Sequence, residues 1–369
     1  MYTIKDELKI HDASAAPPSF GVEVRADPAF ELLVGLSTLT TEREASRPSW
    51  VPAELSSCSV ALRRAVDGVG SEAGEVWLHL LGLALDAPRG TAAQFVETVR
   101  RTNAQELRRH LVGLYVPSWR TVAGPELLER AAEGDPKAIE SLLENESYYA
   151  GKARQSLGLL LPLAAAETKR RLVAALRRFA AEVFEPVEAE VAAILDADAE
   201  AKRALAVRVS PDAVIASAAR GFVYDREPEA SRVVLVPQLA ARPWLLLCQH
   251  RDSRIICYPA DEPREAERDV RERALAFGRA LADDARILIL RRLAVGDASL
   301  TELTELTGLA KSTAHHHLTQ LRAAGLVEVR GNARSYRYAL PEAAAGAAGA
   351  LLAELLSAPP PSPSVSRGS

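Results

Sequence analysis

The chain has 369 residues, of which 48% are hydrophobic and 25% charged, with a formal net charge of −4 at pH 7. This length allows two or three domains of about 100–200 residues, and the composition is that of an ordinary globular protein. The start MYTIKDELKI has no basic stretch followed by an apolar one. No apolar run approaches the ~18 residues of a membrane span, so we expect a cytoplasmic protein without membrane contact. Three cysteines without a CxxC pattern argue against a disulfide framework or a cysteine zinc site.

The first half of the chain predicts helices with recognisable starts. Asp27-Pro28 and Asp135-Pro136 each combine a capping side chain with a proline at the first helical position. Thr91 is expected to cap a helix that runs towards Tyr115. Pro186 is expected to kink or divide a long alanine- and arginine-rich helical stretch.

Short apolar runs replace the helical pattern further along the chain. Val233 to Pro237, Trp244 to His250 and Arg254 to Tyr258 predict a small sheet, and the charged stretch 261–267 predicts a linker. We therefore expect a mainly α protein. Its predicted parts are a helical N-terminal domain with a small β element (1–262), a winged helix-turn-helix domain (263–357) and a disordered Pro/Ser tail (358–369).

The order of elements between residues 284 and 340 predicts the winged helix-turn-helix. A support helix over 285–293 precedes a second helix over 300–307, for which Ser299 and Glu302 form a capping box. Gly308 then ends the second helix, and a third helix is expected over 311–324, before Gly325. Two short strands around a Gly331-Asn332 turn follow and form the wing.

The third helix has two contrasting faces. Its apolar side chains, Ala314, Leu318 and Leu321, share one face and are expected to pack inward. The opposite face carries Ser312, His316, Thr319 and Gln320. Small hydrogen-bonding side chains of this kind suit a helix that enters the major groove and reaches base edges.

The wing and its surroundings are locally basic. Between residues 306 and 340 the only acidic side chain is Glu328, and the local net charge is +4. Arginines near the tip of such a hairpin can bind phosphates or a narrow minor groove. The basic residues of this segment are Lys311, Arg322, Arg330, Arg334 and Arg337.

The segments LTELTGL (303–309), KSTAHHHL (311–318) and LRAAGLV (321–327) resemble the ArsR/SmtB family of transcription regulators. The resemblance covers the last quarter of the chain and implies a homodimeric bacterial regulator, expected to be a repressor, that binds double-stranded DNA. Lys311, Ser312, His315 and His316 would read the operator. Combining the family's recognition helix with the polar face and the wing, the candidate DNA-binding residues are Lys311, Ser312, Thr313, His315, His316, Thr319, Gln320, Arg330, Arg334 and Arg337.

Two departures from the family pattern limit what the resemblance implies. Ala310 stands where members often have a capping serine, a loss of roughly 1 kcal/mol of helix stability. The positions of the family's metal ligands read Val-Gly-Asp-Ala (295–298) and an alanine-rich stretch (343–356), so we expect no metal sensing and no cofactor. The N-terminal region weakly resembles the long N-terminal regions of some actinobacterial ArsR-like proteins, and that resemblance implies no known ligand.

Several alternatives stay open from the sequence. The helix-turn-helix could be a structural module without DNA binding, and the N-terminal domain could be enzymatic or bind a small-molecule effector. The run His315-His316-His317 is a weak metal candidate, because adjacent helical residues diverge by 100°. We expect no enzyme, since no clustered Ser/His/Asp set or His-x-Glu pattern occurs.

Two further expectations concern assembly and redox chemistry. Helices over 268–281 and 343–356 are expected to form a two-fold dimer, because paired half-sites double the DNA contact. If Asp252-Ser253 is a two-residue turn, Cys248 lies opposite Cys257 as a candidate redox pair; the alternative is two small core side chains. The apolar end offered to the dimer consists of Leu351, Leu352, Leu355 and Leu356.

Overall fold

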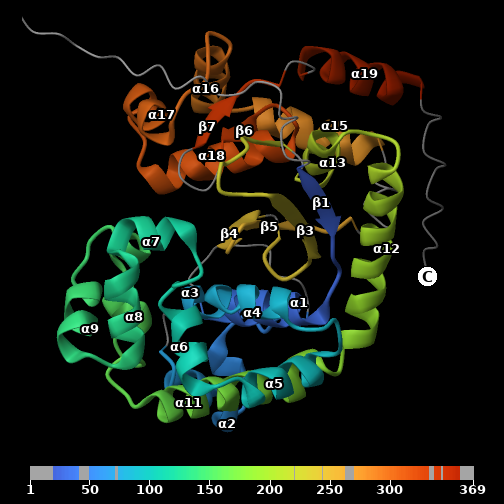
Figure 1. Cartoon of the computed structure of the whole chain (residues 1–369). Coiled ribbons are helices and arrows are strands. Elements are labelled where there is room, and N and C mark those ends of the chain that lie inside the picture. The colour runs from blue at the N-terminus through green and yellow to red at the C-terminus, as the bar shows by residue number, and fades with distance from the viewer. Residues whose placement is uncertain are drawn as a thin grey trace, which may run out of the picture.

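The computed structural model describes residues 20–40, 50–70, 74–219, 221–242, 244–261, 270–331, 336–341 and 344–357. Figure 1 shows a body of helices, a small four-stranded sheet beside it, and a winged unit formed by the C-terminal part of the chain. The long helix α12 (Glu188–Ala206) runs along one side, from the helical body to the winged unit. The chain is mainly helical with small sheets, as the sequence predicts. The predicted linker after Asp261 and the Pro/Ser tail lie outside the described residues.

The helices of the body begin at the predicted caps. Asp27 accepts a hydrogen bond from the Ala29 N–H (3.1 Å), and Asp135 accepts one from the Lys137 N–H (2.9 Å). Thr91 forms a capping box with Gln94. The body helices before α12 are α1 (Pro28–Leu39), α2 (Val60–Asp67), α3 (Gly74–His79), α4 (Leu81–Asp86), α5 (Ala92–Arg101), α6 (Ala104–Leu111), α7 (Pro117–Ala123), α8 (Pro125–Glu133), α9 (Pro136–Leu143), α10 (Ala153–Leu157) and α11 (Ala165–Phe179).

Two long predicted helices are divided. The helix expected from Thr91 towards Tyr115 is split because Asn103 accepts a hydrogen bond from the Gln105 N–H (2.8 Å) and so starts α6. At Pro186 the chain leaves α11 through a π-helical turn (Ala180–Phe184) and resumes in α12. Helix α13 (Pro211–Ala218) then leads to the winged unit.

A mixed sheet lies between the helical body and the winged unit. Its strand order is β1-β3-β5-β4, with β1 and β3 parallel to β5 and with β4 antiparallel to β5 at one edge. Strand β3 is buried at six of its seven residues, which explains why its sequence is a continuous apolar run. The strands are β1 (Gly21–Val24), β3 (Arg232–Gln238), β4 (Leu246–His250) and β5 (Ser253–Pro259).

The predicted register of β4 and β5 is wrong. The two-residue turn is Arg251-Asp252, so Cys248 pairs with Ile255 and Cys257 pairs with Leu246. Arg251 adopts a left-handed φ of 53°, and its N–H donates to the Tyr115 carbonyl (2.7 Å), which fixes the turn one residue earlier than expected. Cys248 and Cys257 therefore do not face each other, and both are free thiols. Cys257 is fully buried in the core, which agrees with the alternative of small core side chains.

The winged unit follows the predicted order of elements closely. The Ser299 capping box with Glu302 and the left-handed Gly308 (φ 68°) are present, and Ala310 makes no side-chain cap. Its elements are α15 (Val270–Leu281), α16 (Asp284–Leu293), α17 (Leu300–Thr307), α18 (Lys311–Ala323), β6 (Glu328–Gly331), β7 (Tyr336–Ala339) and α19 (Ala344–Ser357).

A third strand joins the wing from far upstream. Strand β2 (Phe222–Tyr224) pairs in parallel with β6, so the wing sheet has the order β2-β6-β7. The Val329 N–H donates to the Gly221 carbonyl (2.6 Å), and the Asp225 N–H donates to the Gly331 carbonyl (2.8 Å). A short piece of the predicted N-terminal domain is thus hydrogen-bonded into the winged unit.

Candidate nucleic-acid interface

Packing and one arginine fix the third helix of the motif, α18. Ala314, Leu318 and Leu321 are buried as predicted, with at most 2% exposure. Arg286 on α16 donates through Nε to the Ala280 carbonyl (2.7 Å) and through Nη1 to His317 Nδ1 (3.2 Å). This buried guanidinium ties the end of α15 to the recognition helix. Sequence reasoning missed it, because a lone arginine in a support helix carries no signal.

The first turn of α18 is open to solvent. Lys311, Ser312, Thr313 and His316 are exposed. In helix-turn-helix proteins the N-terminal residues of the recognition helix contact base edges. The first turn therefore offers a lysine and two hydroxyls for that purpose, and His316 on the next turn adds an imidazole.

The rest of the same face is covered by the body. The His315 ring lies 5.0 Å from the Trp244 ring, centroid to centroid, at an interplanar angle of 30°. Thr319 is half-buried and its hydroxyl donates to the His315 carbonyl (2.8 Å). Burial lowers the pKa of His315 and that of Arg322, about two turns further along. His315 and Thr319, both candidate DNA-binding residues in the sequence, therefore contact protein in this conformation.

Gln320 is also engaged. Its carbonyl oxygen accepts from Arg286 Nη1, and its amide nitrogen lies 2.8 Å from His316 Nε2. Because the amide nitrogen is a donor, His316 Nε2 accepts, as it does in a neutral imidazole. Gln320 therefore orients His316 on the exposed turn.

The wing arginines are partly neutralised. Arg330 forms ion pairs with Glu328 (2.6 Å) and, more weakly, with Asp297 (4.0 Å). Arg337 pairs with Glu302 (2.8 Å) and donates to the Asp297 carbonyl (2.8 Å). The local charge of +4 counted along the sequence includes Glu328 but omits Asp297 and Glu302, which precede the counted segment. Arg334 lies outside the described residues.

The three adjacent histidines point in different directions. His315 contacts Trp244, His316 hydrogen-bonds Gln320, and His317 lies near Arg286 and Asp283 (3.7 Å). In the described part of the chain, no three His, Cys, Asp or Glu side chains gather as metal ligands.

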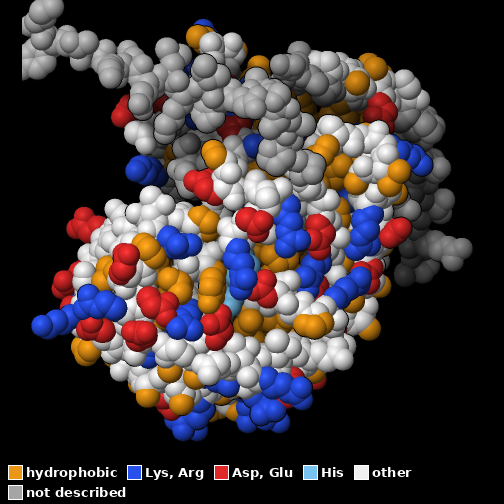
Figure 2. All heavy atoms as spheres, in the orientation of Figure 1, with side chains coloured by type: hydrophobic (Ala, Val, Ile, Leu, Met, Phe, Trp, Pro, Cys, Tyr) orange, Lys and Arg blue, Asp and Glu red, His pale blue; other side chains and the backbone are white. Residues whose placement is uncertain are grey.

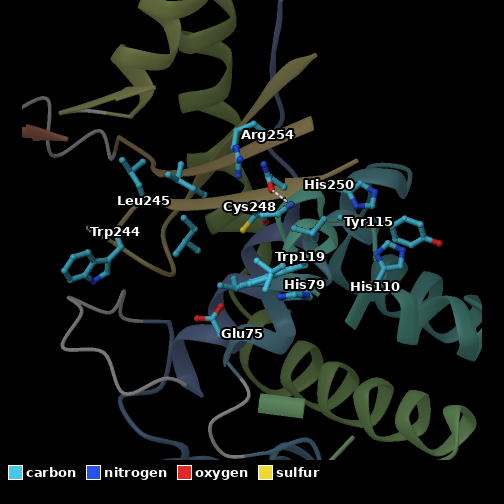
Figure 3. A pocket seen from close by; sticks show the side chains of 18 of the residues that line it. Glu75, His79, His110, Tyr115, Trp119, Trp244, Leu245, Cys248, His250 and Arg254 are labelled. Carbon is cyan, nitrogen blue, oxygen red and sulfur yellow. Dashed lines mark hydrogen bonds between the residues drawn. The ribbon is translucent and has the colours of Figure 1, made fainter. Parts of the chain in front are cut away.

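A large cavity, here called the α7–α18 cavity, separates the covered half of α18 from the body. Its volume is about 1080 Å³. Helices α3, α6 and α7 and the edge strand β4 form one side, and α18 contributes the other. Figure 3 shows Trp119 and His79 together on the helical wall, with Cys248 and Arg254 on the strands and Trp244 at the far end. The α18 residues that line the cavity are Ser312, His315, His316 and Thr319.

Neutral aromatic groups dominate the body side of this cavity. Burial lowers the pKa of His79 and of His110 to about 4, and it also lowers the pKa of His250. The His110 and His250 rings stack at 5.5 Å. The Arg254 guanidinium is paired with buried Glu227, whose carboxylate accepts from Arg254 Nε at 2.7 Å. Apart from the Glu75 carboxylate, the described lining therefore offers a bound molecule mainly aromatic rings, apolar side chains and hydroxyls.

His250 and Asp86 form a pair that resembles part of a catalytic site. His250 Nε2 lies 2.9 Å from the Asp86 carboxylate. The other ring nitrogen, Nδ1, packs against the α4 backbone, since a Cβ added to Gly82 would lie 2.2 Å from it. No nucleophile can lie between that nitrogen and Gly82, so the pair holds β4 against α4 instead of activating a nucleophile.

The surface of the helical body carries both signs of charge. Figure 2 shows basic and acidic side chains interspersed over this face. The ion pairs of the described body include the exposed pair of Arg100 with Glu97 (2.5 Å) and the partly buried pair of Arg171 with Glu167 (2.9 Å). None of the helices in the described part of the chain combines the length and the apolar composition that a membrane crossing needs.

Known proteins match the winged unit. The family model described as bacterial regulatory protein, arsR family, matches residues 283–329. The HTH-type transcriptional regulator CmtR of Mycobacterium tuberculosis, like that of Mycobacterium bovis, is 43% identical over 75 residues. This alignment covers 20% of the present chain and spans only 64% of CmtR.

Solved structures match over about a quarter of the chain. The homodimeric winged helix-turn-helix DNA-binding domain of Mb0332 from Mycobacterium bovis is 28% identical, with 26% of this chain and 84% of that chain covered and a TM-score of 0.20. NolR from Sinorhizobium fredii is 31% identical, with 27% and 97% covered and a TM-score of 0.20. On the family model and the curated relatives, the C-terminal part of this chain contains an ArsR-family helix-turn-helix domain.

Proposed function

We propose that this protein is a sequence-specific, DNA-binding transcription regulator that works on the chromosome in the cytoplasm. The observation that carries the proposal is the solvent-exposed first turn of α18 within an ArsR-family helix-turn-helix. Lys311 contacts phosphate, and Ser312, Thr313 and His316 reach base edges. His315, Thr319 and Gln320 join them once the body no longer covers the helix, and the wing arginines Arg330, Arg334 and Arg337 contact the backbone.

The test begins with DNA fragments selected from the source genome by the full chain. Titrations of the selected site and of a scrambled duplex across salt concentrations separate base reading from phosphate binding. His316→Ala should cost about 1–3 kcal/mol of discrimination at one base position and leave scrambled DNA unaffected. Arg337→Ala should weaken both duplexes alike, by less than one counterion in the salt slope, because Glu302 already neutralises Arg337. If neither duplex binds, or neither substitution changes binding, α18 and the wing are not the interface.

We further propose that the regulator is a homodimer that represses by covering its operator. Helices α15 and α19 pack together and share an ion pair between Arg273 and Glu354. Leu275, Leu352 and Leu356 remain 46%, 56% and 78% exposed on these helices, as expected of a surface that pairs with a second copy. Leu352→Glu combined with Leu356→Glu should halve the mass measured by light scattering. Leu159→Glu, at a 53% exposed apolar position between α10 and α11 of the helical body, should leave it unchanged. A wild-type monomer that stays monomeric on DNA would exclude this assembly.

The regulator acts by binding and not by catalysis in this proposal, and it does not sense metals through the family's usual positions. The packing of His250 against Gly82 supports the first point. The alanine- and leucine-rich sequence of α19 supports the second, since its side chains include a single carboxylate, Glu354, and no imidazole or thiol. Operator affinity should therefore be the same with zinc and with a chelator.

A further inference from the structure

The α7–α18 cavity is built from both parts of the molecule. Val122 and Ser118 of α7 face Ser312, His315 and Thr319 of α18 across it, and β4 closes the back. Its volume of about 1080 Å³ is at the upper end of ordinary ligand sites. A molecule of several rings would fit, and it would contact the body and the recognition helix at once.

The walls select for an uncharged molecule. Leu78, Val116, Leu245 and Leu247 provide apolar surface, and Trp119 and Trp244 provide flat aromatic surface for stacking. Hydrogen bonding is available along the edges, from the hydroxyls and amides of Ser118, Gln249, Ser312 and Thr319.

The charged groups of the lining do not favour an anion. Among the described residues that line the cavity, Arg254 is the only Lys or Arg, and the Glu227 carboxylate already neutralises it. Glu75 places a carboxylate at the wall, which repels negative charge. His79, His110, His250 and His315 supply no positive charge at neutral pH, because burial lowers the pKa of each.

We propose that the α7–α18 cavity binds an uncharged, mainly apolar aromatic molecule with hydroxyl or carbonyl groups at its edges. The bound molecule bridges the body and α18, and so stabilises the arrangement in which Trp244 covers His315. This effect on DNA rests on the proposed function above. Four side chains that line the cavity also belong to the candidate DNA-reading face, so the ligand and the operator compete for the same face and each must weaken the other's binding equally.

Binding is tested first without DNA, on the full chain. N-phenyl-1-naphthylamine is an uncharged aromatic probe whose emission rises in apolar sites, and 1-anilinonaphthalene-8-sulfonate adds a sulfonate to the same ring framework. The uncharged probe should bind at least tenfold more tightly than the anion. Val122→Trp, which fills the cavity from a 38% exposed position, should reduce its affinity at least tenfold. Thr121→Trp, on the exposed side of the same helix, should leave it unchanged.

Two outcomes of the probe experiment would overturn the inference. If the anion binds as well as the uncharged probe, or if the folded Val122→Trp protein binds as wild type, the cavity is not the site and the inference is overturned. Circular dichroism of both tryptophan variants establishes that they are folded.

The second arm adds the selected operator. Saturating operator should displace the uncharged probe, and saturating probe should weaken operator binding by at least fivefold, in wild type but not in Val122→Trp. If the protein binds both probe and operator without interference, the bridging role is wrong while the proposed function stands. If no DNA binds but the probe does, the proposed function fails and the ligand site stands.

Discussion

The two halves of α18 differ in what they contact. The first turn, with Lys311, Ser312 and Thr313, is exposed, whereas the His315 ring contacts Trp244 and Arg322 is half-buried near Tyr338. In the proposed function, the helix therefore begins as a nucleic-acid reader and continues as part of an internal interface. The contrast indicates that burial against the body, and not the helix sequence, limits which of its side chains can meet DNA.

The covered side depends on groups that water does not reach. Arg254 and Glu227 are 1% and 2% exposed, and Tyr224 donates to the same carboxylate (3.1 Å). The pKa of Tyr224 is raised to about 12, first by burial and then by this carboxylate. On the exposed side, by comparison, ion pairs such as that of Arg337 with Glu302 are half-exposed, so water screens them.

The largest effect is expected from removing the charge of Glu227. Glu227→Gln leaves the buried Arg254 guanidinium without a counter-charge and should lower the free energy of unfolding by about 3–5 kcal/mol. Chemical denaturation measures this. Glu23→Gln is the matched control, because its 3.0 Å pair with Arg232 is 43–44% exposed and should contribute less than about 1 kcal/mol. Equal losses for the two variants would mean that burial does not set how much these ion pairs contribute to stability.

The pH dependence of stability is the second test. Between pH 4 and 6.5, His79 and His110 bind protons in the unfolded chain but not in the folded one, so stability should rise with pH. Burial raises the pKa of Glu31 to about 8, from 4.5, so the folded chain holds that proton more tightly and stability falls as pH rises to 8. The two histidines outweigh Glu31 below pH 6.5, and above it only Glu31 remains.

We therefore expect maximum stability near pH 6.5 and a loss of about 2 kcal/mol between pH 6.5 and 8. Denaturant midpoints at half-unit pH steps measure the curve. Glu31→Gln should abolish the fall above pH 6.5 and keep the rise below it. A flat wild-type curve from pH 6.5 to 8 would contradict the neutral, buried state of Glu31.

A smaller change in free energy, in this case of operator binding, is expected when α18 is less covered by the body. Trp244→Ala removes the ring that contacts His315 and should strengthen operator binding about tenfold, or ~1.4 kcal/mol, because less free energy is spent in separating α18 from the body. Fluorescence anisotropy with labelled operator measures it. Val60→Ala, a 52% exposed position on α2, serves as control. Unchanged or weaker binding by the folded Trp244→Ala protein would mean that the cover does not restrain DNA binding.

The smallest effect concerns the exposed turn itself. Ala310 has the extended geometry of a capping residue (φ −60°, ψ 149°) but no oxygen to accept from α18. Ala310→Ser should therefore stabilise the protein by about 1 kcal/mol, seen as a higher thermal midpoint. Ala323→Ser, at the other end of α18, should give no gain. A gain from both, or from neither, would rule out capping as the cause.

The winged unit could be predicted from the sequence because its signals are local. Ser299 forms a capping box with Glu302, and Gly308 is the C-cap of the same helix. Gly325 has the left-handed φ (70°) that its position requires. Each of these effects acts within a few residues, so the helix boundaries in the sequence and in the structure agree closely.

The cavity and the third wing strand could not be predicted in this way. Asp86 and His250 are 164 positions apart, and β2 is three residues long with a partner about a hundred residues further on. The hydrophobic periodicity of the sequence does not predict such pairings, because they depend on how the helices pack. The β4–β5 register was also missed, because the carbonyl of Tyr115, in the turn between α6 and α7, fixes the β4–β5 turn by accepting from the Arg251 N–H.

Strand β2 has a mechanical consequence for any motion that frees α18. The chain passes from the body into the wing sheet at β2, returns to form β3, β4 and β5, and enters the winged unit again before α15. The chain thus crosses between the body and the winged unit three times. These three connections restrain full separation of the two parts more than rotation of one part against the other. In the proposed function, the distance that α18 can travel from Trp244 is therefore limited by the segments on either side of β2.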